Sequence, residues 1–188
     1  MAEPLMRTVD LVAGYGVPVV GPFSLRMEAG DVVGLSGPNG SGKSTLLKAI
    51  ANGARIFSGQ IEKRRGLSLA WQQQQPVRPD ELPFSGVDDL RYARADRISA
   101  PPRLSGWLNQ RVDSLSGGQF QLLSVWVAIA GGAELVLLDE PTNNLDPQGE
   151  DILVETLKGG LEGRAVLIVS HERAFLERAC GSVLEVGA

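Results

Sequence analysis

The stretch GPNGSGKST, residues 37–45, decides the fold class of this chain. It matches the pattern G-x-x-x-x-G-K-[S/T], in which a glycine-rich loop leads directly into a helix. The apolar run VVGL at residues 32–35 precedes it and predicts a buried strand, and residues 43–54 predict the helix that follows. Strand, loop and helix in this order form the context that a phosphate-binding loop requires.

The residue types in this loop suit the phosphates of a nucleoside triphosphate. Glycines let the backbone curl around an anion with its N–H groups aimed inward, and the helix N-terminus adds its dipole. Lys43 would place a positive charge at the β- and γ-phosphates, Ser44 a hydroxyl ligand for Mg²⁺, and Thr45 would support the α-phosphate side. The predicted nucleotide-binding residues of the loop are Gly37, Pro38, Asn39, Gly40, Ser41, Gly42, Lys43, Ser44 and Thr45.

The rest of the chain alternates strands and helices. Strands are expected at residues 7–12, 22–28, 31–35, 60–63, 67–71, 135–138, 165–169 and 182–186, and further helices at 119–130 and 148–161. The runs at 135–138 and 165–169 are almost entirely apolar, which is typical of central parallel strands covered on both faces. This alternation predicts an α/β core.

Residues 76–114 have a different character. Five prolines interrupt this stretch, and its best helix candidate is residues 87–97. We therefore expect a small lobe inserted into the α/β core.

Composition narrows the classes of function. The 188 residues favour one compact domain, and the net charge of −4 argues against nucleic acid as the main partner. Cys180 is the only cysteine, so an internal disulfide or a cysteine zinc site is excluded, and we expect it to pack as a small apolar side chain. No secretory leader is evident, and no apolar stretch approaches the roughly 20 residues that span a bilayer. We expect a cytosolic protein, or one that docks on a membrane through another subunit.

Four further motifs follow the phosphate loop: LSGGQ at 115–119, LVLLDE at 135–140, PTNNLD at 141–146 and LIVSHE at 167–172. With them the chain resembles the ABC (ATP-binding cassette) ATPases, whose signature is LSGGQ and whose landmarks occur in this order. The resemblance runs from about residue 10 to residue 186. It implies that the bound nucleotide is ATP with Mg²⁺.

The resemblance implies roles for three residues near strand ends. Asp139 would hold Mg²⁺, directly or through water, because a carboxylate is a hard oxygen ligand. Glu140 would act as the general base that polarises the attacking water. His171, the only histidine of the chain, would hydrogen-bond the γ-phosphate or that water.

Two further residues of the site rest on local alignment. LAWQQQ at 69–74 resembles the family's Q-loop, which makes Gln74 the glutamine expected at the metal and the attacking water; Gln73 and Gln75 remain alternatives. Tyr15, in GYG, resembles the aromatic residue that stacks on adenine, and could equally pack at a turn.

The signature adds a second anion site. Ser116, Gly117 and Gly118 precede a predicted helix, whose N-terminus attracts negative charge. In the family this segment, with Gln119, faces the γ-phosphate bound by another copy, and Asp146 lies in the adjoining D-loop. One phosphate loop and one signature therefore imply a second ABC cassette, most simply an identical copy, in a head-to-tail dimer.

The helix after the signature departs from the family pattern. Leu122 and Val127 occupy the positions of two arginines, and Trp126 that of a small residue. One interpretation is that the helix is repacked with more apolar side chains. The other is that these residues weaken ATP turnover or create an unusual contact surface. In addition, the lobe is short, at about 40 residues, and little chain follows His171.

The expected fold is a P-loop NTPase core of ABC type with an N-terminal antiparallel β region and a shortened helical subdomain. We expect a single domain over residues 1–188, with the core at about 1–75 and 115–188 and the subdomain at about 76–114. A docking groove is expected beside Gln74 and residues 76–109, with Phe84, Val87 and Leu90 on one helical face; that face could instead pack on the core.

The resemblance implies an ATP-hydrolysing transporter subunit at the cytoplasmic face of the membrane, bound to integral membrane subunits. LPFSGVDDL at 82–90 resembles importers, including those for metal ions. The alternative is a ribosome-binding ABC protein of translation, which EPTNNLD and SHERAFLERA resemble, although such proteins usually join two cassettes. A non-hydrolysing ATP sensor conflicts with the presence of Glu140 and His171.

Overall fold

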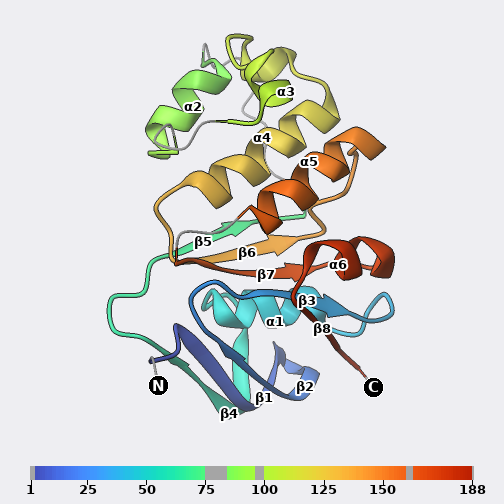
Figure 1. Cartoon of the computed structure of the whole chain (residues 1–188). Coiled ribbons are helices and arrows are strands. Elements are labelled where there is room, and N and C mark those ends of the chain that lie inside the picture. The colour runs from blue at the N-terminus through green and yellow to red at the C-terminus, as the bar shows by residue number, and fades with distance from the viewer. Residues whose placement is uncertain (1–2, 75–83, 96–99, 160–162, 188) are drawn as a thin grey trace.

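Two β-sheets form the frame of the molecule (Figure 1). The computed structural model describes residues 3–74, 84–95, 100–159 and 163–187. The first sheet is antiparallel, in the order β2-β1-β4, with strands β1 (Met6–Tyr15), β2 (Val17–Met27) and β4 (Arg55–Lys63). The second is parallel, in the order β5-β6-β7-β3-β8, with strands β3 (Val32–Ser36), β5 (Leu69–Gln72), β6 (Leu135–Asp139), β7 (Ala165–Val169) and β8 (Ser182–Glu185).

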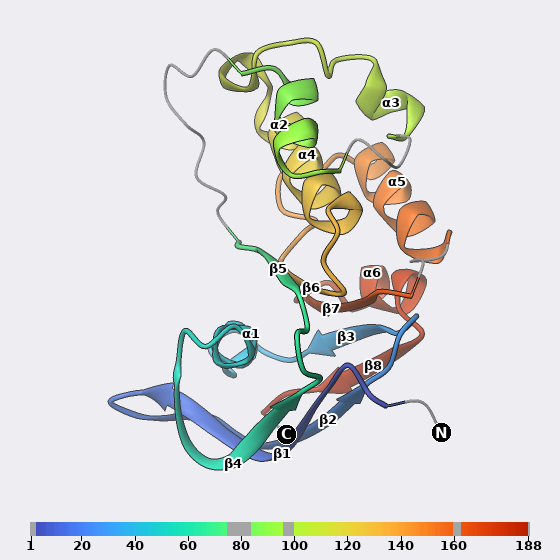
Figure 2. The same ribbon diagram turned by 90° about the vertical axis from the view of Figure 1, so that its left-hand side faces the viewer.

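The helices occupy three positions around these sheets. Helix α1 (Lys43–Ile50) lies between the two sheets, and α4 (Gly117–Ala130), α5 (Pro147–Lys158) and α6 (Arg173–Ala179) cover the other face of the parallel sheet (Figures 1 and 2). Helices α2 (Gly86–Tyr92) and α3 (Pro102–Ser105) pack on α4, and a short 3-10 helix, η1 (Val112–Ser114), leads to the signature. Among the described residues, every helix is too short or too polar to cross a bilayer. The predicted α/β fold with an antiparallel N-terminal region is confirmed.

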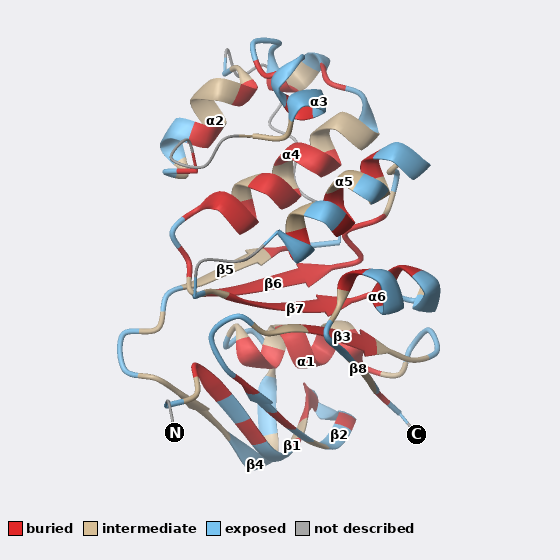
Figure 3. Ribbon diagram, in the orientation of Figure 1, coloured by how far each residue is buried: buried red, intermediate tan, exposed pale blue. Residues whose placement is uncertain are grey.

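The parallel sheet is buried at its centre. Every residue of β6 and β7 is buried, as their continuous apolar runs predict (Figure 3). On one side Leu46, Leu47 and Ile50 of α1 fill the space between the two sheets. On the other side α4, α5 and α6 close a second cluster over the same strands.

Helix α4 is buried on two sides, which explains its unusual sequence. Val125 and Ile129 face the cluster on the parallel sheet, whereas Leu122 and Trp126 belong to the cluster formed with α2 and α3. Apolar residues all round are expected of a helix enclosed in this way. Val127 is partly buried against the same lobe. The replacement of the family's arginines therefore fits a repacked, more apolar helix.

Several predicted elements differ in extent. Helix α1 ends at Ile50 instead of residue 54, since Asn52 follows in a left-handed conformation with φ 63°. Strands β2 and β4 begin earlier than expected, and α3 and α6 were not predicted. The predicted helix 87–97 corresponds to α2, which begins after a capping box formed by Ser85 and Asp88; residues 96 and 97 lie outside the described residues.

Candidate nucleotide site

The phosphate loop joins β3 to α1, as its sequence predicts. Gly42 is the N-cap of α1 and adopts a φ of 94°, a conformation that side chains disfavour. A Cβ atom on Gly42 would lie only 2.5 Å from Cβ of Val20 on β2. The antiparallel sheet therefore supports the loop so closely that only glycine fits at this position.

The side chain of Lys43 reaches back across the glycine-rich part of the phosphate loop. Its side chain is buried, and Nζ donates to the carbonyl oxygens of Gly37 at 2.7 Å and Pro38 at 2.9 Å. The Oγ atom of Ser41 is buried and has no hydrogen-bond partner in the described part of the chain. A phosphate fits these groups, because it would accept from the unpaired hydroxyl and from the ammonium group.

The candidate metal ligands are in contact. Ser44 Oγ donates to Oδ1 of Asp139 at 2.9 Å, at the carboxyl end of β6. Burial raises the pKa of the Asp139 carboxyl; the bond from Ser44 lowers it, and the neighbouring Glu140 raises it again. A hydroxyl and a desolvated carboxylate suit Mg²⁺, which binds proteins through few oxygen ligands and completes its shell with phosphate and water.

Glu140 and His171 form a hydrogen-bonded pair. The carboxylate Oε2 of Glu140 accepts from His171 Nδ1 at 2.8 Å and from the His171 backbone N–H at 3.3 Å. The Glu140 side chain is 9% exposed and that of His171 52%. The Glu140 backbone has a φ of 50°, which is uncommon for a residue with a side chain. Its N–H donates to the carbonyl of Val169, so the end of β7 fixes the turn.

One cavity of about 360 Å³ brings residues of the phosphate loop together with Gln74 and Glu140. Its lining residues are Val19, Asn39, Gly40, Gly42, Lys43, Ser44, Thr45, Gln74 and Glu140. The structure thus brings Gln74 to the phosphate loop, whereas Gln72 and Gln73 line a different cavity. Gln75 lies outside the described residues.

Tyr15 lies at the tip of the β1–β2 hairpin and is not among the residues that line this cavity. Its ring is 5.6 Å, measured to the centroid, from Nζ of Lys48 on α1, and the residue is 47% exposed. An exposed ring next to the helix that follows the phosphate loop leaves both predicted roles, adenine stacking and turn packing, open.

The signature lies at a second, separate cavity. Ser116 caps α4 in a capping box with Gln119, and both line a cavity of about 220 Å³ together with Gly118 and Asp146. This cavity shares no lining residue with the phosphate-loop cavity. A Cβ added to Gly117 would meet nothing within 4 Å, so this glycine faces open space.

Comparison with known proteins decides the family. The profile that describes the family as ABC transporter matches residues 20–143, about two thirds of the chain. The chain belongs to the ABC ATPase family. It is 36% identical to the zinc import ATP-binding protein ZnuC of Jannaschia sp. strain CCS1, over 96% of this chain and 78% of the relative. It is 32% identical to the protein of the same name from Paracoccus denitrificans strain Pd 1222, over 96% and 75%.

The fold of this ABC ATPase also matches solved structures. A structure of an ATP-binding subunit of an ABC transporter superposes with a TM-score of 0.80 at 25% identity, covering 97% of this chain and 85% of the other. Because that match extends over nearly the whole chain, it includes both sheets and the helical lobe.

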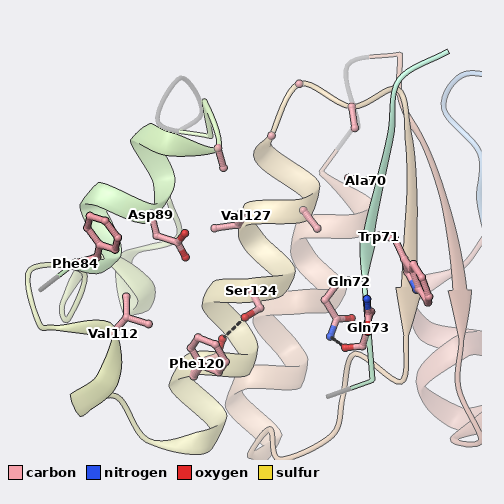
Figure 4. A pocket seen from close by; sticks show the side chains of 15 residues that line it. Ala70, Trp71, Gln72, Gln73, Phe84, Asp89, Val112, Phe120, Ser124 and Val127 are labelled. Atoms are coloured by element: carbon pink, nitrogen blue, oxygen red, sulfur yellow. Dashed lines mark hydrogen bonds between the residues drawn. The ribbon is translucent and has the colours of Figure 1, made fainter. Parts of the chain in front are cut away.

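A groove of about 670 Å³ in this ABC ATPase lies between the lobe and α4 (Figure 4). Phe84, Phe120 and Val127 line it, and Asp89 projects into it from α2. Val87 and Leu90 are not among its lining residues and pack within the lobe instead. Of the three expected contacts, only Phe84 therefore lines the groove. Phe84 precedes α2, which begins at Gly86, whereas Leu90 lies on the face of α2 that packs inside the lobe.

Sequence reasoning missed several residues that position the site. Gln121 is buried on α4 and its Nε2 donates to the carbonyl of Pro141 at 3.2 Å. Arg103 on α3 donates to Asp146 Oδ2 and to Gln148 Oε1, each at 2.7 Å. The glutamine stands two residues after LSGGQ, where the pattern could have indicated it; the arginine has no signal in its proline-rich surroundings.

Proposed function

We propose that this chain is the ATP-hydrolysing subunit of an ABC importer and drives separate integral membrane subunits from the cytoplasmic face of the membrane. The observation that carries the proposal is that Glu140, which accepts from His171, lines the cavity of Lys43 and Ser44; this supports a base beside a triphosphate site. The relatives named zinc import ATP-binding proteins support an importer, and with it the transporter role over the ribosome-binding one. The proposed organisation is one domain, with a core at about 1–75 and 115–188 and a helical subdomain at about 76–114.

The loop and its neighbours would bind ATP. Backbone N–H groups of residues 37–45 and the ammonium of Lys43 would hold the phosphates, and Tyr15 would stack on the base. Ser44, Asp139 and Gln74 would hold Mg²⁺, which when bound neutralises charge on the β- and γ-phosphate oxygens.

Hydrolysis would begin at Glu140. Its carboxylate accepts a proton from a water molecule whose oxygen forms a bond to the γ-phosphorus, and the bond from that phosphorus to the bridging oxygen breaks, so ADP leaves with the electron pair. Since Glu140 accepts from the Nδ1–H of His171, Nε2 at the other edge of the ring is left as an acceptor, which suits a hydrogen bond from the attacking water. Because the side chain of Glu140 is only 9% exposed, its carboxylate is shielded from bulk water other than the attacking molecule.

The separation of the two cavities supports a head-to-tail dimer. The segment Ser116 to Gln119 and Asp146 lie away from the chain's own phosphate loop, so they would complete the site of a second copy. This arrangement predicts complementation. Lys43→Ala damages the loop, and Gly117→Asp places a carboxylate in open space where it would repel the partner's phosphates.

We expect each variant alone to hydrolyse ATP at a small fraction of the wild-type rate, and an equimolar mixture to recover part of it. Phosphate release measured before and after mixing tests this. Recovery requires a heterodimer in which one site carries neither change. Wild-type turnover by either variant at concentrations where the chain is monomeric would overturn the dimer.

The groove beside the lobe would receive an apolar segment of the membrane subunit. Phe84 is 50% exposed at its edge. The Asp89 carboxyl, whose pKa burial raises, has no hydrogen-bond or ion-pair partner in the described part of the chain. A docked segment with a basic side chain would pair with this carboxylate.

Phe84→Asp is therefore expected to abolish co-purification with the membrane subunits while ATP binding stays within about twofold of wild type. Tyr92→Asp is the matched control, because Tyr92 lies at the end of α2 in the same lobe, is 93% exposed and does not line the groove. Affinity purification from membranes, followed by nucleotide titration of each variant, checks both. Equal loss of the complex in the two variants would argue against docking in this groove.

A further inference from the structure

The loop from Pro141 to Asp146 connects the candidate base to helix α5 and is held at both ends by the helical side of the molecule. At its first end Gln121 of α4 donates to the Pro141 carbonyl at 3.2 Å. In its middle, a Cβ on Gly118 would lie 2.6 Å from the Asn144 carbonyl oxygen, so the signature helix and the loop are in direct contact. The position of Glu140 is thus tied to the packing of this loop.

The far end of the loop is fixed through Asp146. Its Oδ1 accepts from the Gly149 N–H at 2.7 Å and caps α5, while its Oδ2 accepts from Arg103 at 2.7 Å. The Arg103 guanidinium uses a second nitrogen for Gln148, in the first turn of α5. Arg103 on α3 therefore links the lobe to Asp146 and Gln148 at the start of α5.

Arg103 also enters the signature cavity. It lines this cavity of about 220 Å³ with Ser116, Gln119 and Leu122. Among the described residues that line it, Arg103 alone has a cationic side chain, and Leu122 stands where the family resemblance places an arginine. The positive charge at this cavity comes here from α3 and not from α4.

We propose that Arg103 is a positioning residue for ATP hydrolysis, which holds Asp146 and the loop behind Glu140 in place of the arginine missing at position 122. This inference rests on the proposed function. The ion pair is about half exposed, with side-chain exposures of 39% and 56%, so its contribution to global stability is small. We therefore expect the ion pair to act on the position of the loop and of Glu140, and not on the free energy of unfolding.

The test compares turnover with stability. We expect Arg103→Leu to lower kcat by on the order of tenfold, because small displacements of catalytic groups have effects of this size or larger. The melting temperature and the affinity of the phosphate loop for ATP should stay close to wild type. Arg103→Lys, which keeps the charge but not the two-pronged contact, should give an intermediate kcat.

Rescue separates this role from a structural one. In the Arg103→Leu background, Leu122→Arg places a guanidinium on the wall of the same cavity and is expected to restore at least a third of wild-type kcat. The control is Arg111→Leu, which breaks an exposed ion pair with Asp113 within the same lobe and should leave kcat unchanged.

Three results would overturn the inference: a kcat for Arg103→Leu equal to that of Arg111→Leu, a fall in kcat matched by a fall in melting temperature, or no rescue by Leu122→Arg in a double variant that melts at the same temperature as Arg103→Leu. A wild-type chain without ATP hydrolysis would overturn the proposed function as well. If the wild-type chain hydrolyses ATP and Arg103→Leu does so at the same rate, the inference on Arg103 fails and the proposed function stands.

Discussion

Glu140→Gln is expected to slow ATP hydrolysis by on the order of 10²–10⁴-fold, because a carboxamide cannot accept the proton of the attacking water. The substitution keeps the size of the side chain, and the amide oxygen can still accept the bonds from His171 that now end on Oε2. ATP binding should therefore persist. With hydrolysis blocked, the ATP-bound dimer should accumulate and elute earlier from a sizing column.

Glu155→Gln is the matched control, since Glu155 is an exposed residue of α5 and lines neither the phosphate-loop nor the signature cavity. Its turnover should equal that of the wild type. Near-normal phosphate release by Glu140→Gln would assign the base to another residue, and slow release without an ATP-dependent dimer would count against the head-to-tail assembly.

Lys43→Ala is expected to weaken Mg-ATP binding by on the order of 10²-fold, the effect of losing a charge-assisted bond to phosphate in a partly desolvated site. Nζ now donates to the carbonyl oxygens of Gly37 and Pro38, and these lie next to a cavity where water can replace the ammonium group. The fold should change little. Titration calorimetry with Mg-ATP measures the loss.

Two further variants show whether charge is the cause. Lys43→Met keeps most of the side-chain volume and should bind as weakly as Lys43→Ala. Lys158→Ala removes an exposed lysine at the end of α5 and should bind normally. Unchanged affinity in Lys43→Ala, as judged by the same titration, would refute the assignment of the phosphate loop.

The sequence predicted the phosphate-loop region well because its signals are local. The order of strand, glycine loop and helix around Lys43, and the carboxylates that follow an apolar strand at Asp139, are patterns in consecutive residues. Glu140 lines the same cavity as Lys43, and Asp139 contacts Ser44 beside it, because the carboxyl ends of parallel strands share an edge. The local alignment predicted Gln74 in place of Gln73, and Gln74 lines the phosphate-loop cavity whereas Gln73 lines another, which is consistent with that prediction.

Other features depend on contacts between distant segments. Helix α6 was not predicted although Phe175, Leu176 and Ala179 are buried on one side, because seven residues give a weak periodic signal. The pairing of Arg103 with Asp146 joins residues 43 positions apart, and no local pattern indicates it. The apolar sequence of α4 is explained by the lobe, which packs on the second face of the helix.

The left-handed backbone of Glu140 sets stability against activity. A residue with a side chain at a φ of 50° costs about 1–2 kcal/mol relative to glycine, which adopts this conformation freely. A chain selected for thermal stability alone would thus gain from a glycine here and lose its carboxylate with it. Engineering that raises the melting temperature of this protein should therefore exclude position 140, because Glu140→Gly would stabilise the fold and remove the proposed general base in the same change.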